Sequence, residues 1–530
     1  MNSLQTDPYL WWFKWLMGIA ALLLLVRIGA APIYILDEAK NAQCAREMWD
    51  RGDWILPTFN GALRTDKPAL HYWFMRLAYT VGGVGAGQAR FFSAILGLGL
   101  LWLTFYHTRK WAGAGVAFFS TSALVLSTHF LFEFRLSVPD PYLIFFTGAG
   151  LFWGFAYLEK GSRRSLLIAA ASLGLAVLAK GPVALALPGL VMVIYIVITK
   201  KWQVFKDPNI LLAALLALCI AVPWYYLVHI KSNGAFTRGF FLEHNLNRFS
   251  SGKEGHGAPF FVTPLIVFVG MLPVSLLAIH SLGKRFNYTK QPFFLFSLVS
   301  VLVYVVFFSI SSTKLPNYPM PCYPFVAVLA GYFLKDLWER RYTVPTYIWW
   351  IWFVFSFAIP IGAYFGLSNE PAVAHYAWLA GPLLVLPALT IFAFFNRSNV
   401  KKAFLSIGLG WIVFSAIFMW IGYPLIYKEN PIAHLKPLIK SKAEVLAYKT
   451  YNPAFNFSFG NADYIIPVVQ SRDSLLLLTQ KMQLLSHEEP VYIISRLEFL
   501  PELEGTGFNE IGRFRDLFEL PTTILLEWKP

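Results

Sequence analysis

The chain of 530 residues is 57% hydrophobic and 17% aromatic, only 14% of its residues are charged, and its mean hydropathy is +0.54. This composition is far more apolar than that of a soluble globular protein, so it predicts a polytopic membrane protein. The formal net charge of +15 would suggest nucleic-acid binding in a soluble domain. In a membrane protein, however, an excess of Lys and Arg is also expected in the cytoplasmic loops. Three widely spaced cysteines indicate neither a disulfide framework nor a metal pattern.

The first apolar stretch, near residues 11–31, leads directly into Pro32 and an acidic pair, Asp37 and Glu38. No Lys or Arg precedes Lys14. We therefore expect this stretch to remain as a membrane anchor and not to be cleaved as a signal peptide.

The acidic pair opens residues 33–73, which we expect to form the first external loop with amphipathic helices. One interpretation is structural: Asp37 and Glu38 cap a short interfacial helix, whose apolar positions recur at helical spacing from Ala42 to Trp49. The other interpretation is a catalytic carboxylate held at the membrane surface. The two interpretations are compatible, and the spacing alone leaves both open.

A stretch of about 20 apolar residues crosses a bilayer as a helix. The sequence predicts thirteen such spans, near residues 11–31, 88–106, 112–132, 139–158, 165–179, 182–199, 210–230, 259–280, 292–312, 318–334, 346–366, 374–395 and 404–426. The fifth and sixth are short and are separated only by Lys180 and Gly181, so their boundaries are the least defined.

Every second linker between these spans is short and basic. Together these linkers carry seventeen positive charges, on Arg109, Lys110, Lys160, Arg163, Arg164, Lys200, Lys201, Lys206, Lys284, Arg285, Lys290, Lys335, Arg340, Arg341, Arg397, Lys401 and Lys402. By the positive-inside rule they mark the cytoplasmic face, which puts the amino terminus inside. They account for more than the whole net charge, so no nucleic-acid partner is needed.

The remaining linkers then face outward and hold the uncommon residues. These are residues 37–73, 133–140, Lys180, 231–259 and 314–323, where 231–258 forms a second large external loop. Ionisable residues next to membrane spans are costly and usually line a site. The convergence of five distant segments on one face predicts a functional site, although snorkelling or helix capping explains any single residue as well.

Residues 1–427 are expected to form the membrane domain and residues 428–530 an external one. After Tyr427 the apolar spans stop, and strand-like runs from Asp463 to Val469, Val491 to Ser495 and Thr522 to Trp528 alternate with a helical run from Ser474 to Leu485. This pattern predicts a small α/β domain.

Six motifs occur in a recognisable order, and together they carry a family resemblance. They are the Asp37–Glu38 pair, RGDWILP from Arg51, TDKPALHYW from Thr65, AKGP from Ala179, EHNLNRF from Glu243 and STKLPNY from Ser312. In combination these motifs resemble the lipid A aminoarabinose transferases. Those enzymes group with protein O-mannosyltransferases among the C-type (GT-C) glycosyltransferases, which use polyprenyl-phosphate sugars. The resemblance covers roughly residues 10–430.

The resemblance implies a fold and a set of roles. The fold is an all-α polytopic membrane bundle of the GT-C type with a small C-terminal α/β domain. Asp37 would be the base that takes the acceptor proton, with Glu38 as its neighbour, because transfer from a lipid phosphate to a hydroxyl needs a base and cations for the leaving phosphate. Lys67, Lys180 and Arg248 would bind the donor phosphate.

Further residues are assigned to substrate binding. Asp140 would bind the sugar or orient Arg135, and helix capping before Pro141 is the alternative. Tyr318, behind Lys314, matches a family aromatic residue near the donor pocket, although an interfacial tyrosine belt explains it equally. His244 is also assigned to substrate binding.

A metal site is not assigned. His244 and His256 could ligate a divalent cation with Asp66, but their spacing is not a recognised metal pattern. The family usually has Glu where this chain has Asp66, so we assign no metal and no other cofactor.

The sequence therefore predicts an inverting glycosyltransferase that moves a sugar from undecaprenyl phosphate to lipid A or a related glycolipid at the periplasmic face of a bacterial inner membrane. A protein O-glycosyltransferase is the nearest alternative. A transporter or lipid flippase would be expected to show internal repeats and a midplane site. This sequence instead shows no visible repeat, and its charges gather on one face. A structural scaffold would not explain the acidic pair, Lys67-Pro68 and Lys180-Gly181-Pro182 together.

Overall fold

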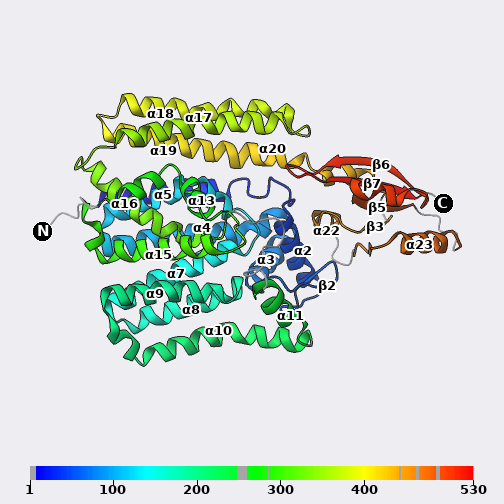
Figure 1. Cartoon of the computed structure of the whole chain (residues 1–530), viewed down its shortest axis with the longest axis horizontal. Coiled ribbons are helices and arrows are strands. Elements are labelled where there is room, and N and C mark those ends of the chain that lie inside the picture. Colours follow the sequence, from blue (N-terminus) through cyan, green and yellow to red (C-terminus); the bar gives the residue numbers. More distant parts are fainter. Residues whose placement is uncertain are drawn as a thin grey trace.

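The computed structural model describes residues 7–246, 259–283, 286–440, 443–460, 465–484 and 490–528, without the side chains of residues 243–246 and 482–484. Long helices lie side by side along the long axis of the molecule, and a small sheet domain adjoins one end of this bundle (Figure 1). The helices of the bundle include α1 (Pro8–Leu25), α4 (Ala86–Ala112), α5 (Ala114–Leu126), α7 (Asp140–Lys160), α8 (Arg163–Lys180), α9 (Val183–Thr199), α10 (Asn209–Lys231), α13 (Val262–Gly270), α14 (Ser275–His280), α15 (Pro292–Ile310), α16 (Tyr323–Trp338), α17 (Thr346–Ser368), α18 (Val385–Phe395), α19 (Val400–Ile417) and α20 (Tyr423–Lys428).

Each of the thirteen apolar stretches expected from the sequence contains a helix. Helices are favoured there because lipid offers no hydrogen bonds, so every backbone group must be paired within the segment. Within the described residues, eight helices are long and apolar enough to cross a membrane, and Ala114–Leu126 and Val183–Thr199 are shorter apolar helices. The exact number of crossings stays a prediction.

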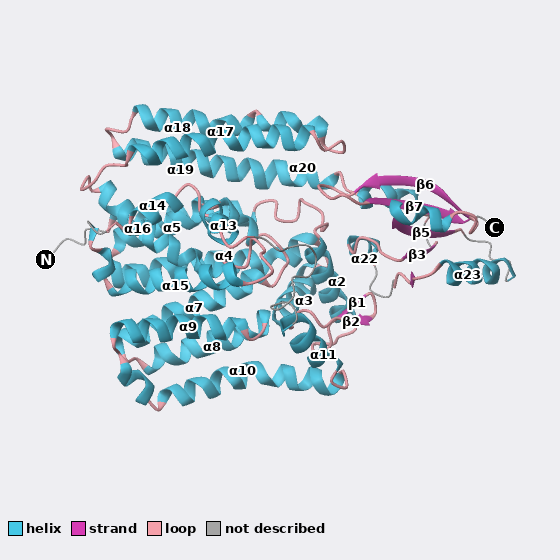
Figure 2. Cartoon of the chain, in the orientation of Figure 1, coloured by secondary structure: helices cyan, strands magenta, loops and turns pink. Residues whose placement is uncertain are grey.

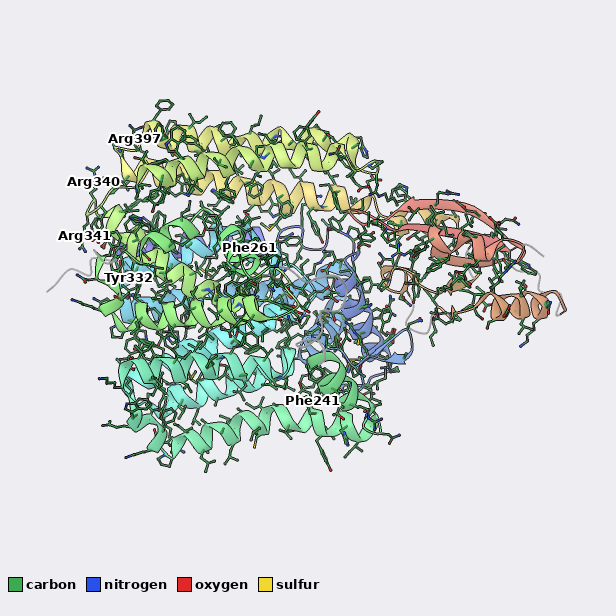
Figure 3. The ribbon with its side chains drawn as sticks, in the orientation of Figure 1. Phe241, Phe261, Tyr332, Arg340, Arg341 and Arg397 are labelled. Carbon is green, nitrogen blue, oxygen red and sulfur yellow. The ribbon has the colours of Figure 1, made fainter. Side chains whose placement is uncertain are left out.

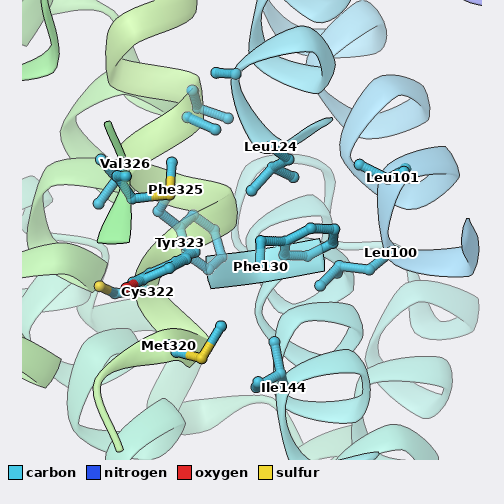
Figure 4. Close-up of a cluster of buried hydrophobic side chains, with 14 of the residues drawn as sticks. Leu100, Leu101, Leu124, Phe130, Ile144, Met320, Cys322, Tyr323, Phe325 and Val326 are labelled. Carbon is cyan, nitrogen blue, oxygen red and sulfur yellow. The ribbon is translucent and has the colours of Figure 1, made fainter. Parts of the chain in front are cut away.

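The core of the bundle is built from side chains of several helices. Phe130, Tyr323 and Phe325 are completely buried there, beside Leu100 and Leu124 (Figure 4). Close packing of such large side chains fixes the helices relative to one another, because interiors tolerate few voids. The ends of these helices therefore present their polar residues at defined positions.

At the end of the bundle next to the sheet domain lies a layer of short elements. It contains α2 (Leu36–Asp50), the hairpin of β1 (Thr58–Phe59) and β2 (Ala62–Leu63), α3 (Leu70–Gly82), α6 (Thr128–Glu133), α11 (Ala235–Arg238) and the π-helix Gly239–Leu246. Figure 2 shows α2, α3 and the hairpin between the long helices and the C-terminal strands. This layer includes the predicted first external loop.

The helix predicted after the acidic pair exists as α2, but it is not a surface helix with a solvated polar face. Glu38, Arg46 and Glu47 on that face are 0%, 8% and 2% exposed. Arg46 donates a hydrogen bond of 3.2 Å to the carbonyl of Phe457, and Asn60 N donates one of 2.7 Å to Glu47 Oε1. The C-terminal domain and the hairpin cover α2, which the sequence pattern alone could not reveal.

The C-terminal domain holds a five-stranded sheet in the order β4-β3-β5-β7-β6. Its strands are β3 (Glu444–Tyr448), β4 (Val468–Val469), β5 (Val491–Arg496), β6 (Phe508–Arg515) and β7 (Thr522–Trp528). β3 pairs in parallel with β4 and β5, and β7 pairs antiparallel with β5 and β6. The described part also contains helices α21 (Pro431–Leu435), α22 (Ala454–Phe459), α23 (Arg472–Leu484) and α24 (Leu500–Leu503). The predicted fold class, an all-α membrane bundle with a small C-terminal α/β domain, is confirmed.

The predicted elements of this domain are partly correct. β5, β7 and α23 match the expected runs, whereas only Val468–Val469 of the run from Asp463 is a strand in the described part. β3 and β6 were not anticipated. β3 is a short, nearly continuous apolar run, and β6 is an edge strand interrupted by an irregular register between Glu510 and Gly512, so neither gives a clear alternating pattern. The predicted domain boundary after residue 427 stays a prediction.

Candidate active site

Asp37 lies in the first turn of α2 and its side chain is exposed. The N-cap of α2 is Ile35, and no side chain caps this end of the helix. The capping interpretation of Asp37 therefore does not hold. The carboxylate instead faces outward at the start of a helix, where the positive end of the helix dipole favours negative charge.

Glu38, the adjacent residue, has a different environment. Its side chain is completely buried, and Arg90 of α4 donates to both carboxylate oxygens over 2.7 Å. The backbone N and the hydroxyl of Ser137 also donate to Glu38 Oε1, over 2.9 and 3.1 Å. The remaining guanidinium protons of Arg90 reach the carbonyls of residues 28, 31 and 32. Glu38 thus ties α2 to α4 and to the turn before α7.

Arg135 holds the carboxyl end of helix α1. It is 7% exposed, and its Nη1 lies 3.0 and 3.1 Å from the carbonyls of Leu24 and Val26 at the end of α1. The expectation that Asp140 orients Arg135 does not hold, because the described contacts of Asp140 are with Lys180. These carbonyl contacts explain the burial of Arg135, and a substrate-binding role for it stays a prediction.

Asp140, Lys180 and Tyr318 form a group at the ends of three segments. Lys180 Nζ pairs with Asp140 Oδ1, and it lies 4.7 Å from the centre of the Tyr318 ring. Gly181 follows with a φ of 90°, a conformation that favours glycine, and this ends α8 directly after Lys180. Asp140 does not cap α7, and Lys180 does not extend into water, so neither structural alternative describes them.

Lys67 lies in the segment between β2 and α3, half-buried beside Pro68. Burial lowers the pKa of Lys67, while the charges of Asp37, Asp66 and Asp140 oppose this and that of Lys180 adds to it. These charges indicate that Lys67 lies near Asp37 and near the Asp140–Lys180 pair. Within the described part of the chain, Lys67 forms no ion pair of its own. It is a cation available to an anionic ligand.

The neighbouring Asp66 is held by Arg64, which donates hydrogen bonds of 2.6 and 3.0 Å to its two carboxylate oxygens. Lys314 donates to the carbonyl of Ser311 over 2.8 Å, within the loop that carries Tyr318. His244 lies on a described helix, but its side chain is not described, and Arg248 and His256 lie outside the described residues. Among the described residues, no three His, Cys, Asp or Glu side chains gather as a metal site would require.

Glu133 belongs to this site and was not singled out by the sequence analysis. It ends α6 and is 5% exposed, and its Oε1 has no hydrogen-bond partner within the described residues. Burial raises its pKa well above the ordinary value; the charges of Asp140, Asp37 and Glu38 raise it further, and that of Lys180 opposes them. A buried carboxyl with an unused oxygen beside other ionisable groups is typical of a functional site. The sequence signal was its place seven residues before Asp140, at the same membrane surface.

These positions can support group transfer from a phosphate. An exposed carboxylate can accept a proton, and the ammonium groups of Lys67 and Lys180 can stabilise a departing anion. The aromatic ring beside Lys180 restricts where that ammonium group lies.

Comparison with known proteins gives a family match and several relatives. Residues 66–227 match the family described as dolichyl-phosphate-mannose-protein mannosyltransferase. An uncharacterized protein of Aquifex aeolicus is 30% identical over 316 residues, which cover 59% of this chain and 70% of that protein. The undecaprenyl phosphate-alpha-4-amino-4-deoxy-L-arabinose arabinosyl transferase of Aeromonas salmonicida is 27% identical over 426 residues, 75% of this chain and 76% of that protein.

Among solved structures, ArnT from Cupriavidus metallidurans bound to undecaprenyl phosphate superposes with a TM-score of 0.78. The match covers 97% of this chain and 98% of that one, at 21% identity. The chain belongs to the ArnT-like GT-C glycosyltransferases. An ArnT-like enzyme is a multi-pass protein of the bacterial inner membrane, so the predicted family, enzyme class and membrane are confirmed. The transporter and scaffold alternatives are set aside.

Proposed function

We propose that this ArnT-like glycosyltransferase moves a sugar from undecaprenyl phosphate to lipid A or a related glycolipid at the outer face of the inner membrane. The observation that carries the proposal is the exposed carboxylate of Asp37 in the same charged group as Lys67, Lys180 and Asp140. The names of the Aeromonas relative and of the ligand bound to the Cupriavidus protein support the donor.

In this mechanism Asp37 takes the proton from the acceptor hydroxyl as its oxygen attacks the anomeric carbon of the sugar. The bond between that carbon and the phosphate oxygen breaks, and undecaprenyl phosphate leaves as an anion. A single displacement inverts the anomeric centre. Lys67 and Lys180 bind the phosphate as its charge develops, with Arg248 as a third cation.

The buried acids have supporting roles in the proposal. Glu38 is fully engaged by Arg90 and Ser137, so it positions Asp37 and does not itself accept the proton. Asp140 holds Lys180 beside Tyr318. Glu133, whose raised pKa favours the neutral acid, can donate a hydrogen bond to the sugar or the phosphate.

An apolar cavity supports lipid substrates. Its volume is about 510 Å³, and its lining includes Thr128 and His129 of α6, Val269 of α13, Phe414 of α19 and Pro316. Pro316 lies in the same loop as Lys314 and Tyr318, so the cavity reaches the segment that borders the charged group. Such an apolar lining suits part of a lipid chain by its chemistry.

The experiment uses purified enzyme with an undecaprenyl-phosphate sugar and two separate acceptors, lipid A and an unfolded bacterial protein. Transfer to lipid A, with an inverted linkage, is the expected result. Transfer to the protein alone would favour the O-mannosyltransferase alternative, which the match over residues 66–227 supports. No transfer to either acceptor, with the enzyme folded and the donor bound, would contradict both. Mass spectrometry of lipid A and glycoproteins from cells with and without the protein provides the cellular counterpart.

A further inference from the structure

Two cavities adjoin each other where α17 faces α19, and the first lies at the end of the bundle farthest from the candidate active site. The first has a volume of about 410 Å³ and a partly polar lining that includes Thr343, Thr346, Arg397 and Ser398. The second has a volume of about 500 Å³ and is lined almost entirely by apolar side chains. Neither cavity contains a residue of the proposed transfer mechanism.

The two cavities meet at one aromatic side chain. Phe404 of α19 lines both. On the facing helix, Trp349 lines the polar cavity and Trp352 the apolar one, and their rings meet edge to face with centroids 5.2 Å apart. The apolar cavity then extends along α19 past Gly408. A polar chamber thus adjoins an apolar chamber in the direction from the membrane surface to its interior.

One positive charge lies beside each of the two cavities. The Arg397 guanidinium lies 4.3 Å from the centre of the Phe394 ring, which lines the polar cavity. The Lys401 ammonium lies 5.3 Å from the centre of the Trp338 ring, which lines the apolar cavity. Arg340, Arg341 and Arg397 all lie at this end of the bundle (Figure 3).

The nearby acids do not neutralise the two cations that border the cavities. Glu339 pairs with Lys335 at 3.3 Å and with Arg341 at 2.9 Å, and Asp336 pairs with Arg341 at 3.1 Å. Arg397 and Lys401 form no ion pair with any carboxylate in the described part of the chain. Both therefore remain available to an anion from outside the protein.

We propose that these cavities bind one anionic phospholipid, with its phosphate beside Arg397 and Lys401 and one acyl chain in the apolar cavity behind Phe404. The membrane supplies this occupant at the correct depth, because a phospholipid has a phosphate at the surface and an apolar chain directly below it. A free phosphate would use only the polar chamber, and a neutral lipid only the apolar one. Under the proposed orientation, the lipid belongs to the cytoplasmic leaflet.

Native mass spectrometry of the full-length enzyme tests the proposal with three probes: phosphatidylglycerol, phosphatidylcholine and inorganic phosphate. We expect one phosphatidylglycerol to bind at least about tenfold more tightly than phosphatidylcholine, because charge-assisted hydrogen bonds give at least such a factor. We expect no binding of inorganic phosphate at the same concentrations. Equal binding of the two lipids would overturn the phosphate site, and phosphate binding alone would overturn the lipid as occupant.

Two variants separate the chambers. Arg397→Gln with Lys401→Gln removes the charges, and Gly408→Trp fills the apolar cavity. The Cβ at Gly408 would meet only Leu126 Cδ2, at 4.0 Å, so the backbone need not move. Each variant is expected to lower phosphatidylglycerol binding at least about tenfold, close to the effect of losing one such hydrogen bond.

Matched controls exist for both changes. Arg163→Gln with Arg164→Gln removes two exposed charges from another basic linker. Gly362→Trp adds the same side chain at an exposed position of α17, where a Cβ has no neighbour within 4 Å. The controls should bind phosphatidylglycerol like the wild type and keep the same melting temperature. Wild-type binding by both test variants, or an equal loss in the controls, would refute the site.

Discussion

Arg90 binds both carboxylate oxygens of Glu38 over 2.7 Å, while the adjacent Asp37 is exposed at the first turn of the same helix. Two neighbouring acids thus have opposite environments. The structure divides the acidic pair into one residue that holds α2 in place and one that is accessible to a substrate.

This division predicts opposite effects of two conservative substitutions. Asp37→Asn should lower transfer at least about a hundredfold, the low end of what general base catalysis contributes, with an unchanged melting temperature. Glu38→Gln should instead destabilise the protein, because breaking a buried ion pair costs about 3–5 kcal/mol. The measurements are turnover of purified enzyme and thermal unfolding in detergent.

Asp50→Asn provides the matched control, since Asp50 is an exposed acid at the other end of α2. It should have wild-type turnover. Near-normal turnover of the Asp37→Asn variant would exclude Asp37 as the base, and a stable but inactive Glu38→Gln variant would transfer that role to Glu38.

Lys67 predicts a pH dependence of donor binding. Burial lowers the pKa of this lysine in the folded protein, so it loses its proton below the ordinary value of 10.5 as the pH rises. The KM for the polyprenyl-phosphate sugar should therefore rise on the alkaline side, before an ordinary lysine would titrate. Lys67→Arg should abolish this rise, because arginine stays charged, and Lys67→Ala should weaken donor binding at every pH. An identical alkaline profile in the arginine variant would show that another group titrates.

Substitutions in the Asp140–Lys180 pair should change stability and sugar transfer together. Lys180→Ala leaves Asp140 buried without its cation, so we expect a loss of both stability and transfer. Asp140→Asn in the same protein should recover much of the stability but not the transfer, because the phosphate still lacks its ammonium partner. Lys231→Ala is the control: its pair with Asp53 is 3.4 Å long and Lys231 is 47% exposed, so about 0–1 kcal/mol should be lost. Full transfer by the double variant would exclude Lys180 from phosphate binding.

Glu133 predicts a pH dependence of stability. Its pKa in the folded protein is raised above the ordinary 4.5 by burial, so the folded state keeps a proton that the unfolded state releases. The free energy of unfolding should therefore fall as the pH rises from about 4.5 through the raised pKa. Glu133→Gln stays neutral, so its stability should exceed that of the wild type increasingly over this range. Parallel stability curves for the two proteins would show that Glu133 ionises normally.

The orientation of the chain predicts the location of its carboxyl terminus. Seventeen positive charges in alternate linkers favour an inside amino terminus and, with thirteen crossings, an external C-terminal domain. A reporter fused after Pro530 should be active only outside the cytoplasm. Cytoplasmic activity would place Asp37 and Lys67 on the face opposite to the one proposed.

The sequence by itself determined the membrane character, the helical stretches and the face on which the unusual residues gather. Those features depend on local composition and on charge counted along the chain, which need no knowledge of contacts. The order of motifs also gave the family. The residues Asp37, Lys67, Asp140, Lys180 and Tyr318 could thus be named as one site before any geometry was known.

Only the tertiary structure decided what each residue contacts. In the structure Asp140 pairs with Lys180 and not with Arg135. Glu38 is buried against Arg90, which is 52 positions away in the sequence. It also revealed Glu133, whose unused oxygen is a property of its surroundings. Burial, pairing and pKa depend on segments distant in sequence, so local patterns cannot encode them. The covered polar face of α2 has the same cause, because the C-terminal domain that packs on it begins about 400 residues further along the chain.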